Sequence, residues 1–184
     1  MTSIPTWFGA FDLAPAHERP ALLADPVAAA LAALPADLRA EVQSTPIDPE
    51  LADTAAFCEH YGAPLEASAN CVIAAGRREG VERFAAVVVL ATARADINGA
   101  VRRHIDVRKI SFAPMDTATG MTGMEYGGIT PLGLPDAWPI LVDRAVTEAG
   151  PVVIGSGRRA SKIVVDGGAL ARFPRVEVLD GLTR

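Results

Sequence analysis

A series of short apolar runs in the second part of the chain most constrains its fold. The runs are bounded by glycine, proline or charged residues, which is typical of buried strands. None approaches the roughly 18 to 20 apolar residues that a membrane-spanning helix needs. The pattern predicts strands over residues 71–75, 84–91, 107–112, 139–142, 151–154, 161–165 and 176–178. The first two, bounded by Gly76 and Gly80, predict a hairpin.

Helical segments precede and separate these strands. Asp25 followed by Pro26 is typical of a helix start, and Gly62 followed by Pro64 is typical of a helix end. We predict helices over 26–34, just after Pro35, and over 53–60, 95–104, 114–119, 143–149 and 168–172. The interleaving predicts an α+β fold, a single mixed-sheet domain with flanking helices. We expect residues 1–40 to form an N-terminal helical extension packed on a domain of residues 41–184.

The composition favours one intracellular domain. The chain has 184 residues, enough for one core but not for two comfortable ones. Its two cysteines, Cys58 and Cys71, are too few for a disulfide framework or a zinc site. The N-terminus has no basic segment ahead of an apolar core, so no signal peptide is expected. We therefore expect a cytoplasmic protein, with no membrane partner and a monomer as the default state.

Charge is unevenly distributed along the sequence. The net charge is −5, yet residues 67–184 contain fifteen bases and twelve acids. Contacts to phosphate dominate the affinity of proteins for nucleic acid, so any such contact is expected in this part. Four adjacent basic pairs are the candidates, and each pair could instead serve only solubility: Arg77 and Arg78, Arg102 and Arg103, Arg108 and Lys109, Arg158 and Arg159.

The densest local signal is the segment 123–133, which contains four glycines and a proline. Glycine reaches backbone angles closed to other residues and lets a ligand approach bare N–H groups. Such a loop costs conformational entropy to order, a cost found where the backbone itself binds or catalyses. A tight connection between strands is the plain alternative.

Several segments, in order, resemble the YbaK/EbsC family, the free-standing relatives of the editing domain of bacterial prolyl-tRNA synthetases. The most specific is the loop from Thr122 to Gly133, which resembles the family's "tG…GGisPfG" pattern. The segments 53–58, 95–101, 107–113, 139–143 and 154–158 also match, so the resemblance covers roughly residues 40–182.

The resemblance implies a trans-acting aminoacyl-tRNA deacylase, a hydrolase that serves translation fidelity by cleaving the ester of a mischarged tRNA. Its partners would be the acceptor end of aminoacyl-tRNA and possibly a synthetase. Backbone N–H groups would stabilise the tetrahedral oxyanion. Gly127 and Gly128, together with Asn70, are the residues expected to be catalytic. The residues expected to bind the substrate are Gly123, Thr130, Pro131, Gly155, Ser156 and Gly157. Asp143, after its strand, would bind the α-amino group or only cap the next helix.

One position departs from the family pattern. The first core strand begins with a lysine in the family, and here Asn70 stands in its place. An asparagine can orient a carbonyl or a water, but it carries no charge. The chain has two lysines, Lys109 and Lys162, and neither is an obvious substitute from the sequence. A non-catalytic module that binds an aminoacyl end or another small ligand is therefore the alternative function.

Other candidates for chemistry are weaker. A nucleophilic Ser156 would need a histidine partner, but His60 and His104 are expected on helices away from the loop. Cys71 is better explained as a small core residue than as a nucleophile. Residues 155–160 formally match a dinucleotide fingerprint, but a strand follows where a helix is required. No residues have metal-ligand spacing, and no cofactor is expected.

Overall fold

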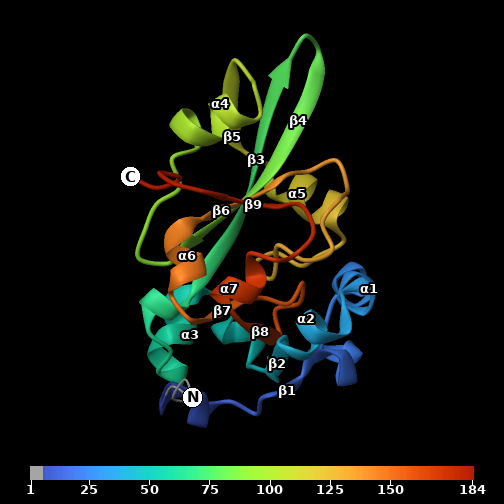
Figure 1. The fold of residues 1–184 in the computed structure, drawn as a ribbon, viewed down its shortest axis with the longest axis vertical. Coiled ribbons are helices and arrows are strands. Elements are labelled where there is room, and N and C mark those ends of the chain that lie inside the picture. Colours follow the sequence, from blue (N-terminus) through green and yellow to red (C-terminus); the bar gives the residue numbers. More distant parts are fainter. Residues whose placement is uncertain (1–5) are drawn as a thin grey trace.

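Two sheets organise residues 6–184, the part of the chain that the computed structural model describes (Figure 1). The first sheet is antiparallel, with the strand order β1 (Ala14–Pro15), β2 (Gln43–Pro46), β8 (Ser161–Asp166) and β7 (Pro151–Gly155). The second is mixed, with the order β5 (Lys109–Phe112), β3 (Ala69–Arg78), β4 (Val81–Leu90), β6 (Ile140–Asp143) and β9 (Val176–Leu179). In it, β4, β6 and β9 run parallel, and β3 is antiparallel to both β4 and β5.

Short helices connect the strands. The α-helices are α1 (Asp25–Ala33), α2 (Ala36–Ala40), α3 (Thr54–Tyr61), α4 (Arg102–His104), α5 (Met115–Thr122), α6 (Arg144–Glu148) and α7 (Gly167–Leu170). The 3-10 helices are η1 (Thr6–Ala10), η2 (Ala16–Glu18), η3 (Pro20–Leu22), η4 (Pro49–Leu51) and η5 (Leu65–Ala67), and η6 (Ile97–Val101) is a π-helix. The expected α+β class is confirmed, with the strands divided between two sheets.

The hairpin is longer than the sequence predicted, because Gly76 lies inside β3 and does not end it. A Cβ on Gly76 would lie 2.7 Å from the carbonyl oxygen of Lys109, so the glycine permits a close approach of the segment leading into β5. The single helix predicted over 95–104 is also wrong in detail. Asp96 caps this segment by accepting a hydrogen bond from the Gly99 N–H at 3.1 Å, and the segment consists of the π-helix η6 followed by the short helix α4.

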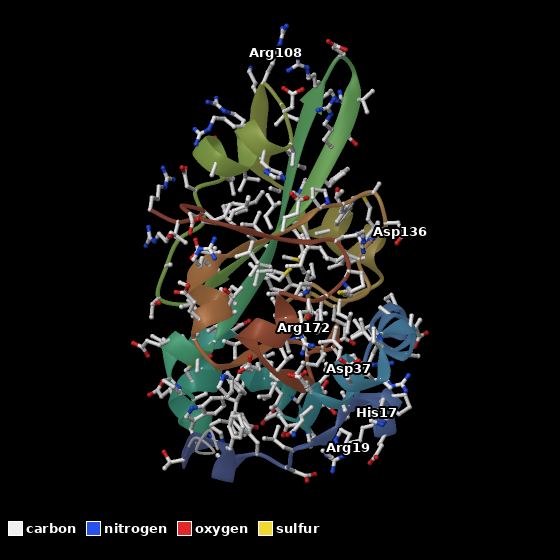
Figure 2. The ribbon with its side chains drawn as sticks, viewed as in Figure 1. His17, Arg19, Asp37, Arg108, Asp136 and Arg172 are labelled. Carbon is white, nitrogen blue, oxygen red and sulfur yellow. The ribbon has the colours of Figure 1, made fainter. Side chains whose placement is uncertain are left out.

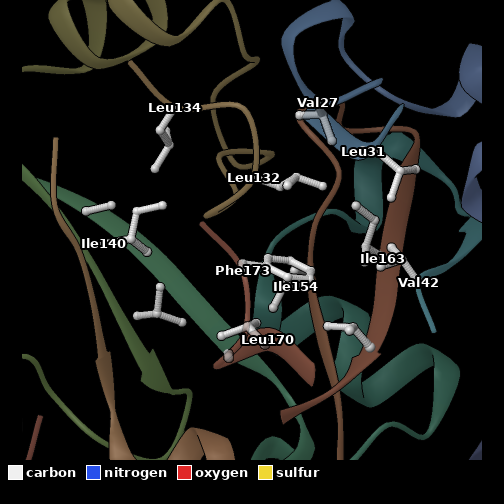
Figure 3. Close-up of a cluster of buried hydrophobic side chains, with 14 of the residues drawn as sticks. Val27, Leu31, Val42, Leu132, Leu134, Ile140, Ile154, Ile163, Leu170 and Phe173 are labelled. Carbon is white, nitrogen blue, oxygen red and sulfur yellow. The ribbon is translucent and has the colours of Figure 1, made fainter. Parts of the chain in front are cut away.

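The main apolar core lies between the two sheets. Figure 3 shows side chains that meet there from α1, both sheets, α7, the glycine loop (residues 123–133) and the segments next to these elements: Val27, Leu31, Val42, Leu132, Leu134, Ile140, Ile154, Ile163, Leu170 and Phe173. A second cluster, including Val87, Val101 and Leu141, covers the other face of the five-stranded sheet. Because successive residues of a strand face opposite sides, Val153 and Val164 point away from the main core and pack near Phe57 of α3.

The N-terminal elements contact this framework directly. Val27 and Leu31 of α1 belong to the main core. The ring of Phe11 stacks on that of Phe57, with their centroids 5.7 Å apart, so aromatic side chains near the N-terminus pack on α3. A domain division at residue 40 stays a prediction, and the first five residues of the expected extension lie outside the described part of the chain.

Candidate active site

A cavity of about 410 Å³ lies where the first residues of β3 meet α3, α5 and the glycine loop. Strands β7 and β8 form its floor, through residues 153–155 and Lys162. Phe112, Met115 and Tyr126 line it as well, and each is more than half exposed, so an apolar rim surrounds its opening. The cavity therefore combines an apolar entrance with a deeper part built from backbone and a few polar side chains.

The glycine loop is held against the end of β7. The N–H of Gly157 donates to the carbonyl of Gly128 at 2.7 Å. A Cβ on Gly155 would lie 2.6 Å from the carbonyl oxygen of Ile129, closer than any side chain tolerates. Gly127, with a φ of +78°, then turns the chain into the cavity wall. The glycines thus fix the loop on the strand and present Gly127 to the cavity.

The N–H groups of the loop divide into engaged and free donors. The N–H of Gly128 donates to the carbonyl of Glu125 at 2.9 Å, so Gly128 and Gly157 both use their N–H groups to hold the loop. Among the described residues, the N–H of Gly127 meets no acceptor. Gly127 therefore keeps a hydrogen-bond donor available at the cavity.

Strand β3 contributes a second backbone element, an unpaired edge. Strand β5 pairs with residues 74–77 only, and the last bond is donated by the Ala113 N–H to the Ile73 carbonyl at 2.8 Å. In an antiparallel ladder, the N–H and C=O of residues two apart point to the same side. Those of Cys71 consequently point to the open edge, at a residue that lines the cavity. The edge offers a ligand one peptide donor and one peptide acceptor.

Asn70 lines the same cavity, one residue before Cys71. Its Oδ1 accepts a hydrogen bond from the Thr54 hydroxyl of α3 at 2.7 Å. That bond leaves the two N–H donors of the amide for other partners. The residue that replaces the family lysine is thus held by its oxygen and has donors to offer.

The sequence missed one functional candidate, Lys162. It lies on β8 opposite Gly155, on the face of the sheet that packs against α3, and its side chain reaches the cavity. The residue is only 8% exposed. Its Nζ donates to the carbonyl of Ala52 at 2.8 Å and lies 5.5 Å from the centroid of the Phe57 ring. The available signal was a lysine inside an otherwise apolar buried strand, where a charge needs a partner or a function.

The surroundings of Lys162 change its chemistry. Burial, and secondarily the positive charge of Arg159, lowers the pKa of Lys162 to about 8. An ammonium has three N–H donors, and one acceptor is in place, the carbonyl of Ala52. Two donors therefore remain for a ligand in a largely apolar cavity, where a hydrogen bond from a cation is stronger than in water. Asp53, which also lines the cavity, lies 3.6 Å from Arg159.

Seven other residues expected at the site do not line the cavity. Some of them have structural roles, and the structure explains no role for the rest. They are Gly123, Gly128, Thr130, Pro131, Asp143, Ser156 and Gly157. Asp143 accepts a hydrogen bond from the Ala145 N–H at 3.0 Å, which makes it the N-cap of α6. Gly123 is the left-handed C-cap of α5. The structure thus brings Asn70, Gly127 and Gly155 together at the cavity.

Neither nucleophile candidate is set up for covalent chemistry. Ser156 is fully buried, and its hydroxyl bonds to the hydroxyl of Ser161 at 2.7 Å. Burial raises the pKa of the Cys71 thiol to about 12, so the reactive thiolate is scarce near neutral pH. Neither side chain is therefore placed or ionised to attack a bound ligand.

In residues 6–184, no group of three or more His, Cys, Asp or Glu side chains is arranged to hold a metal ion. No helix in this range is long and apolar enough to cross a membrane.

Proteins of known structure with a similar fold include one described as an editing enzyme. No curated protein sequence matches the chain. A candidate trans-editing enzyme for prolyl-tRNA synthetase has a similar structure, with a TM-score of 0.71 and 17% identity over 88% of this chain and 96% of the other. A hypothetical protein is also similar, with a TM-score of 0.64 and 20% identity over 76% and 86% of the two chains. Both share the fold.

Residues 48–173, more than half of the chain, match the sequence profile of the aminoacyl-tRNA editing domain. The match contains α3, the first core strand with Asn70, the glycine loop and Lys162. It confirms the kind of family that the loop from Thr122 to Gly133 indicated. The chain belongs to the aminoacyl-tRNA editing domain family.

Proposed function

We propose that the chain is a trans-acting aminoacyl-tRNA deacylase, which hydrolyses the ester between a wrong amino acid and its tRNA in the cytoplasm. One observation carries the proposal: the cavity next to Asn70 holds a buried ammonium, that of Lys162. The family pattern supplies a lysine from the first core strand. In this chain a lysine on β8, in the other sheet, reaches the same cavity.

The backbone supports the recognition of an aminoacyl group. Its ester carbonyl needs donors and its α-ammonium needs acceptors. The free N–H of Gly127 and the peptide groups of Cys71 at the β3 edge are available for these contacts. Asp53 is the carboxylate that lines the cavity, so we assign it, and not Asp143, to the α-ammonium. The apolar rim receives the terminal base of the tRNA.

Lys162 acts on the ester carbonyl. Attack by water converts the carbonyl oxygen into an oxyanion, and the two unused N–H donors of Lys162, with the N–H of Gly127, stabilise it. Asn70 orients the water through its amide. Collapse of the intermediate breaks the bond to the ribose oxygen. Over the whole reaction, the hydroxyl of water stays on the amino acid and its proton passes to the ribose oxygen.

The test is deacylation of a panel of mischarged tRNAs, including alanyl-, cysteinyl- and seryl-tRNA(Pro), by the wild type and by Lys162→Met. Removing one oxyanion donor typically lowers kcat by about 10²–10³-fold, and we expect a loss of this size. Arg39→Met is the matched control, because it removes one positive charge from a side chain outside the cavity that donates a hydrogen bond to the carbonyl of Ala32. Equal activity of Lys162→Met and the control would refute the role of Lys162.

The alternative, a module that binds without turnover, follows from Asn70 in place of the family lysine. It predicts no release of amino acid from any member of the panel, together with saturable binding of a 3′-aminoacylamide of adenosine. That pair of results from folded protein would replace the deacylase with a binding function.

A further inference from the structure

The charge of the molecule is concentrated at one end. Residues 76–112, which form most of the β3–β4 hairpin, α4 and β5, carry eight basic and four acidic side chains, a net charge of +4. Since the whole chain has a net charge of −5, the remainder carries −9. Figure 1 shows these elements together at the end of the molecule opposite the N-terminal segments. A polyanion would therefore meet this end preferentially.

The structure separates the four basic pairs of the sequence into two kinds. Arg77 is paired with Glu82 at 3.0 Å and Arg78 with Asp106 at 2.5 Å. Arg158 donates to the carbonyl of Leu23, and Arg159 is held by contacts near the cavity. These cations are engaged by the protein itself. They are therefore poor candidates for binding the negative charges of a partner.

The other two pairs are free of such contacts. Arg102, Arg103, Arg108 and Lys109 are exposed, and no carboxylate among residues 6–184 lies within ion-pairing distance of any of them. We call these four residues the basic end. Figure 2 shows Arg108 at the extremity of the molecule, directed into solvent. Long cationic side chains without internal partners keep their full charge available for phosphates.

The basic end is connected to the cavity by one short strand. Lys109 begins β5 and Phe112 ends it, and Phe112 belongs to the cavity rim. Three steps along a strand cover about 10 Å. A stacked nucleotide strand advances about 3.4 Å per residue, so roughly three nucleotides span this distance. Strand β5 is also the outer strand of its sheet, on the same side as the unpaired β3 edge.

From this arrangement we propose that the basic end binds the phosphates of the RNA strand that leads to the aminoacylated 3′ nucleotide in the cavity. The placement of that nucleotide rests on the proposed function. The first phosphates to reach Lys109 and Arg108 belong to nucleotides about three positions before the 3′ end, and Arg102 and Arg103 extend the contact toward the duplex. The contacts are to phosphate, so they do not depend on sequence.

Two matched double variants test the proposal. Arg108→Gln with Lys109→Gln removes two charges from the basic end. Arg19→Gln with Arg39→Gln removes two charges at the other end of the molecule, where Figure 2 labels Arg19. The probe is an acceptor-stem RNA minihelix that carries no amino acid. Its binding is measured by fluorescence anisotropy at salt concentrations from about 50 to 200 mM.

We expect the basic-end variant to bind about tenfold or more weakly at 0.15 M salt, and its plot of log affinity against log salt to be shallower by about 1.4 to 1.8. The control pair should keep the wild-type slope. Equal slopes for the two variants, or no binding of the minihelix by the wild type, would overturn the proposal.

Hydrolysis assays on two substrates test the RNA-binding surface and the deacylase activity independently. The same aminoacyl ester is presented on the minihelix and on adenosine alone. We expect the basic-end variant to lose kcat/KM on the minihelix and to keep the wild-type value on adenosine, which has no phosphate to contact. If neither ester is cleaved by any form, the deacylase is refuted, while a basic-end variant that binds the minihelix more weakly still supports the RNA surface.

Discussion

Replacing Lys162 by methionine should stabilise the protein at neutral pH while it removes the proposed activity. The pKa of this lysine falls from 10.5 to about 8 on folding, mainly because burial removes water from the ammonium. At pH 7 both the folded and the unfolded chain hold the proton, so the folded state bears the whole cost. At 1.36 kcal/mol for each pKa unit, that cost is about 3 kcal/mol. Methionine has a similar length and no charge to bury.

Two favourable contacts are lost with the ammonium. The hydrogen bond to the Ala52 carbonyl contributes about 1 kcal/mol and the contact with the Phe57 ring about 0.5–1 kcal/mol. The net expectation at pH 7 is a variant about 1–2 kcal/mol more stable than the wild type.

The pH dependence gives the sharper signature. Stability rises with pH wherever the unfolded state binds more protons than the folded state. Between the folded pKa of about 8 and the unfolded value of 10.5, the wild type sheds its penalty because the folded state loses its proton first. From pH 7 to 9.5 the advantage of Lys162→Met should therefore shrink by about 2 kcal/mol. Below about pH 7, where both states hold the proton, it should be constant.

Urea unfolding followed by tryptophan fluorescence at pH 7, 8 and 9.5 measures these differences for the wild type and the variant. Lys109→Met, at the exposed lysine, controls for the loss of one positive charge. A stability difference between wild type and Lys162→Met that does not change over this pH range would show that the ammonium is not held at a cost. The reasoning about the cavity would then fail at its first step.

The remaining predictions concern two positions. Asn70→Lys alone should not raise deacylation, because a second ammonium in the same cavity repels the first. In the Lys162→Met background the same substitution should restore activity by about tenfold or more, measured as single-turnover release of amino acid. No rescue in that background would contradict the idea that a lysine on β8 replaces the family lysine of β3. Asp143→Ala should lower the free energy of unfolding by about 1 kcal/mol through loss of a helix cap. Asp143→Ser keeps a capping oxygen and should leave the free energy of unfolding unchanged. Neither variant should change kcat/KM. A large rise in KM for both variants would instead show that Asp143 contacts the substrate.

Local patterns predicted most of the fold. Short apolar runs gave the strands, and Gly62 and the Asp25–Pro26 pair marked helix ends close to their places. The position of Gly76 was predicted wrongly, as the end of a strand. A glycine that ends a strand and a glycine inside a strand, where another segment passes closely, cannot be distinguished in the sequence. Only the path of the segment before β5 distinguishes the two.

The candidate site was predicted in part. The glycine loop directed attention to Gly127, which lines the cavity, because glycine-rich loops leave backbone groups open to a ligand. The role of Gly127 stays a prediction. Lys162 was not predictable in the same way, because its role depends on the register of β7 with β8 and on the packing of α3 over that face. Thr54, which holds Asn70, is sixteen positions away in sequence, and no local pattern connects the two.

The unpaired edge of β3 also has a consequence for the behaviour of the protein in concentrated solution. Exposed strand edges recruit strands from other molecules and lead to aggregation. Here the open stretch is short, and residues of α3, α5 and the glycine loop surround the cavity onto which it opens. Substitutions that loosen these elements, far from any reacting atom, would expose the edge and turn a recognition element into a nucleus for self-association.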